Sequence, residues 1–325
     1  MKFNLRAVVM LAAVFALLAS PARAQPYPSK PVRILMPLAA GSAVDVVARI
    51  VAEKMSEKVG QGIVVENMPG AAGLVGMRSG AKAAPDGYTL LAVNDSVMTM
   101  LPHMRAEAGY DPLKDFVPIT QMVRIQWALI AHPSAGLASV GELLAKARSS
   151  PESLTFASGG IGSPQHMAME ILMHASGAKL RHVPYRGVTQ GLNDVLSGHV
   201  PVMFVGLPMP NEFVKGGQLT LLGAASEQRI PLFPDRPTIA ESGLQGFSFY
   251  TWGALLAPAG TPPEIVGTLS RAAIAALRDQ AVEKRLTELG YDVVANTPEE
   301  FAKALRRDYA RMGEIIKAAD IRVNP

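Results

Sequence analysis

Cysteine is missing from all 325 residues of the chain. The protein therefore makes no disulfide and has no thiolate for catalysis or metal binding, and we expect no lipoprotein anchor at its processed N-terminus. Long apolar runs are missing as well. The run at residues 7–19 is shorter than the ~20 residues that a transmembrane helix needs, and no later run is longer. These absences exclude a disulfide scaffold and thiol chemistry, and they argue against a membrane span.

The motifs of several enzyme classes are also missing. The sequence has no G-x-x-x-x-G-K-[ST], no complete G-x-G-x-x-G, no H-E-x-x-H and no G-x-S-x-G. The six histidines are scattered, and only His166 and His174 fall in one expected helix, so a histidine metal site is not indicated. A serine nucleophile at Ser96 or Ser163 with His166 stays open, although no base and orienting acid stand at a recognisable spacing. We therefore predict no catalytic residue, no metal and no cofactor.

The charge of the chain is nearly balanced. The formal net charge is +4, but residues 1–24 contain Lys2, Arg6 and Arg23 and no acid, which leaves 28 basic and 27 acidic residues. We therefore expect no nucleic-acid partner. The composition, 49% hydrophobic and 18% charged, is typical of a folded protein with one large or two medium cores.

The first 24 residues have the pattern of a secretory signal peptide. Lys2 and Arg6 precede the apolar run, and the small-x-small triplet at residues 22–24 is followed by Gln25. We predict cleavage after Ala24 and a freely diffusing periplasmic protein. An uncleaved membrane anchor is the alternative, which the short apolar run disfavours.

Strand-like and helix-like stretches alternate along the rest of the chain. Apolar runs predict strands at residues 31–38, 62–70, 88–94, 127–133, 154–160, 200–206 and 218–225. Apolar spacing predicts a helix after Ser42 that ends at Gly60, and another that begins at Ser163 and Pro164. The sequence therefore predicts an α/β fold with largely parallel sheets.

The C-terminal part has a different pattern. Residues 262–289 predict one long helix, and a capping box from Thr297 to Glu300 predicts a second helix that ends near Ala319, with no strand between them. We expect this segment to pack against an earlier sheet.

Three glycine-containing turns each follow a strand-like run and precede a helix start, at residues 39–45, 157–166 and 183–194. In open α/β sheets such turns lie at the carboxyl ends of strands, where free N–H groups and the positive end of the helix dipole favour an anion. Glycine also lets a ligand oxygen approach the backbone closely. Three converging turns would bind a carboxylate with few charged side chains.

The side chains at these turns have structural as well as ligand-binding interpretations. Asp45 stands three residues after Ser42, so we expect it to hold the turn, while Ser42 could cap the helix, bind ligand or do both. Ser163 could cap its helix as well as bind ligand. For His166, we favour packing or indirect support of the site over direct contact with ligand. Arg186 has the fork that suits a carboxylate, or it is simply a solvated arginine on a loop.

Several longer segments resemble one family of proteins. They are residues 27–76, APDGYTLL, YDPLKDFVPI, ASGGIGSPQHMAMEIL, VPYRGVTQGLNDVLSGHV, PDRPTIAESGLQGF and LLAPAGTPPEIV. Together they are similar to the Bug (TctC-type) family, the extracytoplasmic solute receptors of tripartite tricarboxylate transporters. The resemblance covers essentially the whole mature chain, from residue 26 to about residue 320.

The resemblance implies the type II periplasmic-binding-protein fold, with two α/β lobes, two crossover strands and ligand in the cleft. One lobe would combine residues 25–125 with 252–325, and the other would hold residues 126–251. The family's partners would be a small carboxylate and the large and small membrane subunits of a transporter, with the receptor as a monomer. The positions that match the family's ligand loops, with His166 and Phe204, are Leu38, Ala39, Ala40, Gly41, Ser42, Asn94, Ser96, Ser158, Gly159, Gly162, Ser163, His166, Tyr185, Arg186, Gly187, Val188, Thr189 and Phe204.

The chain departs from the family pattern where ligand selectivity would be set. Leu38 replaces a common phenylalanine, Val188 replaces a common serine or threonine, and Phe204-Val205-Gly206 replaces FDN. Without these polar side chains, the amino group of an amino acid or the hydroxyl of a hydroxylated acid would have no hydrogen-bond partner in the cleft. Each unpaired group would cost ~1–3 kcal/mol of binding free energy. With Trp127 and Trp252 close to the expected crossovers, we predict a carboxylate with an apolar or aromatic body, such as terephthalate.

Two other functions are compatible with parts of this pattern. A ligand sensor for a membrane signalling protein would use the same fold and cleft, and the receptor sequence does not separate it from a transport receptor. An exported hydrolase would need an activated nucleophile, which the missing elbow motif disfavours.

Overall fold

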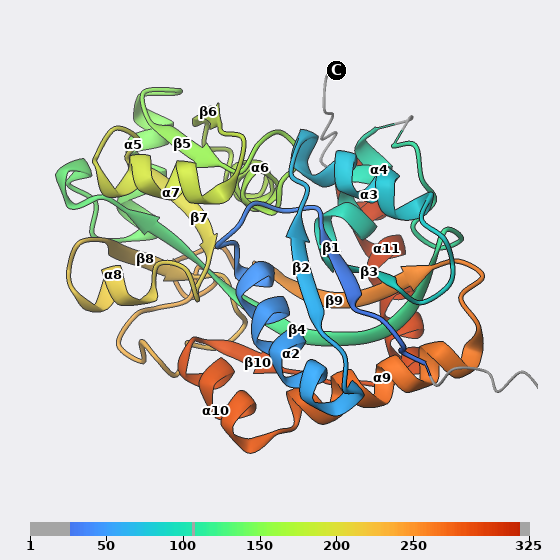
Figure 1. Cartoon of the computed structure of the whole chain (residues 1–325). Helices are drawn as coiled ribbons and strands as arrows, with labels where there is room; N and C mark the ends of the chain where they lie inside the picture. Colours follow the sequence, from blue (N-terminus) through green and yellow to red (C-terminus); the bar gives the residue numbers. More distant parts are fainter. Residues whose placement is uncertain (1–26, 106–107, 319–325) are drawn as a thin grey trace, which may run out of the picture.

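The computed structural model describes residues 27–105 and 108–318, which form two α/β lobes side by side (Figure 1). The predicted signal peptide and its cleavage site lie outside the described residues. Within those residues, no helix combines the length and the apolarity that a bilayer crossing requires.

The first lobe is built on a mixed sheet with the strand order β2-β1-β3-β9-β4. Its first three strands run parallel, β9 pairs antiparallel with β3, and β4 pairs antiparallel with β9. The short β10 pairs with β4 at its free edge. The strands are β1 (Val32–Met36), β2 (Ile63–Asn67), β3 (Thr89–Asn94), β4 (Phe116–Ala131), β9 (Tyr250–Pro258) and β10 (Tyr291–Val293).

Helices cover both faces of this sheet. Helix α2 packs against α9, and α11 packs against β4 and the short η2. The helical elements of this lobe are α2 (Ala43–Val59), η1 (Ala71–Gly73), α3 (Leu74–Ala81), η2 (Ser96–Met100), α4 (Leu101–Met104), α9 (Pro263–Leu277), α10 (Gln280–Glu288) and α11 (Pro298–Ala318). As predicted, α2 ends at Gly60, whose φ of 69° is the left-handed conformation that glycine adopts without strain.

The second lobe has the parallel strands β7, β5 and β6, with β8 paired to β4. Its core includes Phe156, Val202 and Phe204, which are fully buried. The elements are η3 (Pro133–Ala135), α5 (Val140–Ser149), β5 (Thr155–Ser158), α6 (Pro164–Ser176), β6 (Arg181–Pro184), α7 (Val188–Leu196), β7 (Val202–Gly206), α8 (Asn211–Lys215) and β8 (Thr220–Ala224).

Strand β4 belongs to both lobes and forms the first crossing between them (Figure 1). It pairs with β9 up to Gln126 and with β7 from Trp127 onward. The chain returns at Phe249, whose N–H donates to the carbonyl of Ala225 just before Tyr250 begins β9. The predicted α/β fold with two crossovers is therefore confirmed. The exact lobe boundaries stay a prediction, which the change of partner after Gln126 supports.

The C-terminal segment corrects two expectations. The stretch from Pro262 to Leu289 is not one helix, because Asp279 caps a new helix by accepting hydrogen bonds from the N–H groups of Ala281 and Val282 (3.1 and 3.4 Å). The segment also contains a strand, β10. The capping box is confirmed: the Glu300 carboxylate accepts from Thr297 N–H, and Thr297 Oγ1 accepts from Glu300 N–H.

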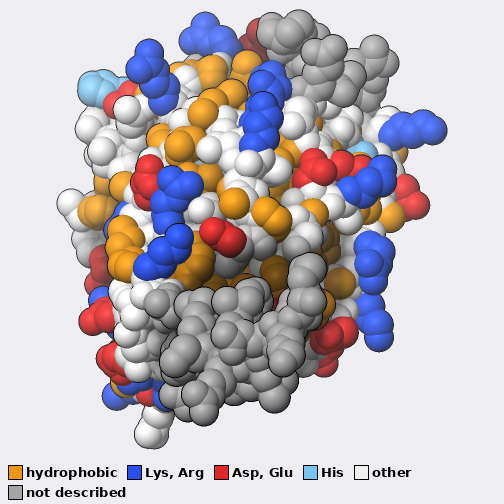
Figure 2. All heavy atoms as spheres, turned by 45° about the vertical axis from the view of Figure 1, so that its right-hand side comes forward, with side chains coloured by type: hydrophobic (Ala, Val, Ile, Leu, Met, Phe, Trp, Pro, Cys, Tyr) orange, Lys and Arg blue, Asp and Glu red, His pale blue; other side chains and the backbone are white. Residues whose placement is uncertain are grey.

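Acidic and basic side chains are interspersed over the face of the molecule that Figure 2 shows. On this face neither sign of charge gathers into a large single area, and apolar side chains lie among uncharged polar and backbone atoms between the charges.

Candidate ligand-binding site

A cavity lies between the two lobes, and we call it the cleft cavity. It is lined by residues that follow β1, β3, β5 and β6. Its solvent-accessible volume is about 70 Å³, which is room for several water molecules or one small ligand. Helices α2, α6 and α7 all begin at this cavity, so three sets of free N–H groups and three positive dipole ends meet there.

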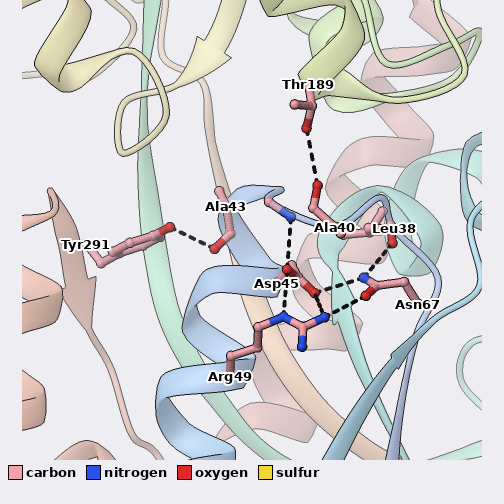
Figure 3. Close-up of polar contacts among 9 residues, drawn as sticks. Leu38, Ala40, Ala43, Asp45, Arg49, Asn67, Thr189 and Tyr291 are labelled. Atoms are coloured by element: carbon pink, nitrogen blue, oxygen red, sulfur yellow. Dashed lines mark hydrogen bonds and ion pairs between the residues drawn. The ribbon is translucent and has the colours of Figure 1, made fainter.

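The first turn, residues 38–42, is held by Asp45 from below (Figure 3). The N–H of Gly41 donates to Asp45 Oδ2 over 2.9 Å, and Arg49 and Asn67 donate to the same carboxylate over 2.8–3.2 Å. Burial raises the pKa of Asp45, but these hydrogen bonds outweigh burial and hold the pKa below its usual value. Asp45 is thereby an ionised clamp that fixes the shape of the turn.

The side chain of Ser42 takes no part in this hydrogen-bond network, in which Asp45 is the acceptor. Ser42 stands at the N-cap of α2, but its side chain makes no capping bond. Its Oγ is buried and has no hydrogen-bond partner among the described residues, while the residue lines the cleft cavity. A buried hydroxyl without a partner is costly. Ser42 Oγ is therefore positioned to pair with an atom that enters the cavity.

The second turn, residues 158–166, is stabilised from within. Ser163 caps α6 by accepting from His166 N–H (3.4 Å), and His166 Nδ1 accepts from Gly162 N–H (3.1 Å). Ser158 Oγ is 2.5 Å from His182 Nε2, and it accepts from Gly160 N–H (3.1 Å). Ser158 is fully buried and does not line the cleft cavity, so this serine–histidine pair holds the turn.

The third turn brings the lobes together. Thr189 Oγ1 donates to the carbonyl of Ala40 over 3.3 Å, across the cleft (Figure 3). A Cβ at Gly187 would lie 2.9 Å from Ala39 Cβ, so only glycine permits this approach. Arg186 is exposed at the cavity and makes no hydrogen bond or ion pair with the rest of the described chain. Its guanidinium is available to an anionic ligand.

One wall of the cleft cavity is apolar and rigid. Trp127 is 3% exposed, and its ring packs edge-on against Phe249. Its indole N–H donates to Thr251 Oγ1 over 2.7 Å, so its one polar atom is already paired. Gly206 lies opposite Trp127 in the sheet, and a Cβ there would come within 2.9 Å of Ile125. The site therefore combines anion-binding turns with an indole wall.

With this geometry described, comparison with known proteins identifies the family. Residues 47–321 match the model of the tripartite tricarboxylate transporter family receptor. The chain belongs to this receptor family. A protein encoded between tcbD and tcbE in Pseudomonas sp. (strain P51) is 33% identical over 95% of this chain and 93% of its own length. BugT of Bordetella pertussis is 32% identical over 97% of both chains.

Solved structures agree with this assignment. The periplasmic binding protein BugD superposes with a TM-score of 0.87 at 32% identity, over 91% of this receptor and 99% of BugD. A Rhodopseudomonas palustris protein solved with adipate has a TM-score of 0.88 at 29% identity, over 91% of this receptor and 99% of that chain. MatC of the same organism, solved with malate, has a TM-score of 0.86 at 29% identity, over 89% and 100%. These relatives and this fold are those of solute-binding receptors and not of enzymes.

The receptor brings ten of the predicted ligand residues together around the cleft cavity. They are Leu38, Ala39, Ser42, Asn94, Ser96, Gly159, Ser163, Arg186, Gly187 and Val188. The other eight do not line this cavity, although each lies within two residues of a lining residue along the chain: Ala40, Gly41, Ser158, Gly162, His166, Tyr185, Thr189 and Phe204. Phe204, for example, is fully buried and stacks on Phe247. For all eighteen, direct contact with a ligand stays a prediction.

Residue-level reasoning missed part of the lining. Ile125, Met209 and Thr251 line the cavity but stand in no glycine turn, so no local signal marked them. Gly70 and Gly73, outside the three predicted glycine turns, also line it. Trp127 was marked by its place near the crossover, whereas Trp252 points elsewhere, since its indole N–H donates to Asp308 (3.1 Å).

We expect the receptor to lose stability in acid partly through His182. Burial, and then His166, lower the pKa of His182 to about 3. An unfolded histidine titrates near pH 6.5, so between pH 6.5 and 3 the unfolded chain binds more protons and the fold is weakened as pH falls, by at most ~1.4 kcal/mol per pH unit. Urea unfolding at several pH values should show a shallower acid slope for His182→Gln than for the wild type. His174→Gln, at an exposed position, should keep the wild-type slope, and equal slopes for all three would contradict the assignment.

Proposed function

We propose that this receptor captures a small carboxylate with an apolar or aromatic body, such as terephthalate, in the periplasm. It then delivers the ligand to the large and small membrane subunits of a tripartite transporter. The observation that carries the proposal is Ser42 Oγ at the start of α2, buried and without a hydrogen-bond partner among the described residues, in a cavity that is also lined by Trp127. Relatives solved with adipate and with malate support the carboxylate class.

The anionic end of the ligand is matched by the turns. Free N–H groups at the starts of α2 and α7 and the hydroxyl of Ser42 donate hydrogen bonds without adding a buried charge. Arg186 supplies one cation, and its exposure lets it meet a second carboxylate or the first one as the ligand enters. A dicarboxylate can therefore be held at both ends.

The body of the ligand is matched by the apolar wall. Trp127, Ile125, Val188 and Met209 offer no free donor or acceptor, because the indole N–H of Trp127 is taken by Thr251. A hydroxyl on the ligand facing this wall would lose its water without gaining a partner, which costs ~1–3 kcal/mol. An aromatic ring instead gains contact with the indole.

The two-lobed fold suits capture and delivery. Bending at the crossings would open the cleft, and the Thr189–Ala40 hydrogen bond would re-form on closure over the ligand. The closed surface would be the one that the membrane subunits recognise. The receptor acts as a monomer after removal of its signal peptide at Ala24.

Thermal-shift screening of the mature chain, from Gln25 onward, tests the proposal. Mono-, di- and tricarboxylates, aliphatic and aromatic, are compared, and calorimetry follows each hit. A micromolar ligand at millimolar concentration adds ~4 kcal/mol of stability. An aromatic dicarboxylate should raise the Tm most and should not be consumed with time.

Ser42→Ala should weaken the best hit about tenfold to a hundredfold, since a hydrogen bond to a charged group is worth ~1.5–3 kcal/mol. The same substitution should leave the unliganded Tm unchanged or slightly raised, because Ser42 Oγ has no partner in the described chain. Arg186→Ala should also weaken binding, with Arg236→Ala, another exposed arginine, as its control. No shift with any carboxylate, or full affinity in Ser42→Ala, would overturn the proposal.

A further inference from the structure

A second cavity lies between η2, α6, α11 and the start of β9. It shares no lining residue with the cleft cavity. The two are separated by the residues that follow β3 and by the start of β9, where Thr251 lines the cleft cavity and its neighbours Tyr250 and Trp252 line the second one. Asn94 and Ser96 line the cleft cavity, whereas Asp95 between them lines the second one. The second cavity therefore lies behind the segment from Asn94 to Ser96, on the side away from the cleft cavity.

Asp95 is a buried acid without a counter-charge. It is 3% exposed, and its Oδ1 has no hydrogen-bond partner among the described residues. Asp308 on α11 lines the same cavity, but its carboxylate accepts from Trp252 Nε1 (3.1 Å) and from Arg307 Nε (3.0 Å). The charge of Asp308 is thus met by a cation, and that of Asp95 is not.

Among the described residues, two arginines stand near this cavity, and neither forms a hydrogen bond or ion pair with Asp95. Arg311 lines the cavity, but its side chain is exposed and its guanidinium is directed to the hydroxyl of Tyr250 (3.4 Å) and to its ring. Arg124 on β4 also lies against that ring. Helix α6 contributes only Ile171. Burial, and then the charge of Asp308, raise the pKa of Asp95 well above its usual value, which expresses the same imbalance.

We propose that the second cavity binds a small monovalent cation, of the size of sodium or ammonium, at Asp95 Oδ1 in exchange for the carboxyl proton. One positive charge balances Asp95, whereas a divalent ion would leave a buried excess charge. Carboxylate and hydroxyl oxygens coordinate hard metal cations such as sodium, and they accept hydrogen bonds from ammonium. The solvent-accessible volume of this cavity is about 40 Å³. This volume admits a small ion with a few waters and excludes a large organic cation.

An ion at this position would affect the lining of the cleft cavity. An ion at Asp95 fixes the backbone between Asn94 and Ser96, both of which line the cleft cavity. The site goes beyond the proposed function and stands whether or not the cleft binds a carboxylate.

The test is made on the mature chain with no carboxylate present. Thermal unfolding at pH 8 is measured in sodium chloride, in ammonium chloride and in choline chloride at one fixed ionic strength. Sodium or ammonium at about ten times its dissociation constant should raise the Tm by ~2–4 °C over choline, and the rise should saturate. The rise should shrink at pH 5, where protons compete for the carboxylate.

Two variants separate a bound ion from a general salt effect. Asp95→Asn keeps the size and shape of the side chain but removes its negative charge. This variant should have the same Tm in sodium or ammonium chloride as in choline chloride. Asp235→Asn, at an exposed position, should keep the higher Tm in sodium or ammonium chloride. Equal Tm values in all three salts, or an unchanged rise in Asp95→Asn, would overturn the proposal. Broadening of the ²³Na resonance by the wild type and not by Asp95→Asn would support it independently of folding stability.

Discussion

Replacing Gly76 with alanine should lower the free energy of unfolding by about 3 kcal/mol and weaken ligand binding at least tenfold. Gly76 lies in α3 where this helix crosses the strand end that leads into the first turn. An added Cβ would lie 2.8 Å from Pro37 Cα and 2.9 Å from the carbonyl oxygen of Met68. Both are backbone atoms, so neither moves without shifting the segment. Since Pro37 and Leu38 line the cleft cavity, the displacement reaches the ligand site directly.

A helical glycine elsewhere in the chain provides the matched control. At Gly267 in α9 the nearest atom to an added Cβ is the flexible end of Arg271. Gly267→Ala should therefore be neutral or stabilise by ~0.5–1 kcal/mol through helix propensity. Chemical denaturation gives both values, and calorimetry with the best carboxylate gives the affinities. A Gly76→Ala protein with wild-type stability would show that the helix can withdraw from Pro37 without cost.

Replacing Trp127 with alanine should have the second large effect. Removal of a buried aromatic ring from a packed site costs ~3–5 kcal/mol. It also removes the cavity wall and leaves the hydroxyl of Thr251 without its donor. We expect aromatic dicarboxylates to bind at least tenfold more weakly, with a smaller loss for short aliphatic ones.

Trp127→Phe separates the ring from its N–H group. It keeps an aromatic wall but loses the 2.7 Å hydrogen bond, so it should cost about 1–2 kcal/mol of stability and preserve the preference for aromatic ligands. If Trp127→Ala instead kept full affinity for every aromatic ligand, the wall would have no part in selectivity.

The parts of the fold that the sequence predicts are those set by local chemistry. Helix α2 is marked by its apolar spacing and its terminal Gly60, and α11 by the reciprocal bonds of Thr297 and Glu300. The three glycine turns were also predictable, because close backbone approach needs a missing Cβ. Their convergence on one cavity follows from the general geometry of α/β sheets.

Other parts depend on contacts that are distant along the chain. Nothing local shows that β4 changes partner after Gln126, or that β9 inserts between β3 and β4. Strand β6 has no buried position to mark it. The break at Asp279 was missed because an acid at that point also fits the solvent face of one longer helix.

The site shows the same limit in its side chains. Ser42 and Asp45 both carry oxygens that could cap α2, and only the folded turn shows that Asp45 binds Gly41 N–H while Ser42 is left free. Trp127 and Trp252 were equal candidates for the cleft, and the register of two strands decides that one forms its wall and the other meets Asp308. The burial of Asp95 beside Asp308 is visible only once α11 is in place.

The order of strands in the first lobe also bears on how the chain folds. Its sheet runs β2-β1-β3-β9-β4, so the strand beside β3 is supplied by residues 250–258. During synthesis, the first three strands emerge long before that partner, and the N–H and C=O groups on the edge of β3 that faces β9 stay unpaired until most of the chain has been made. Pairings between such distant segments form slowly. A nascent chain with this strand order remains unfolded for longer than one whose neighbouring strands are consecutive in the sequence. A slowly folding chain of this kind suits export across the inner membrane in an unfolded state.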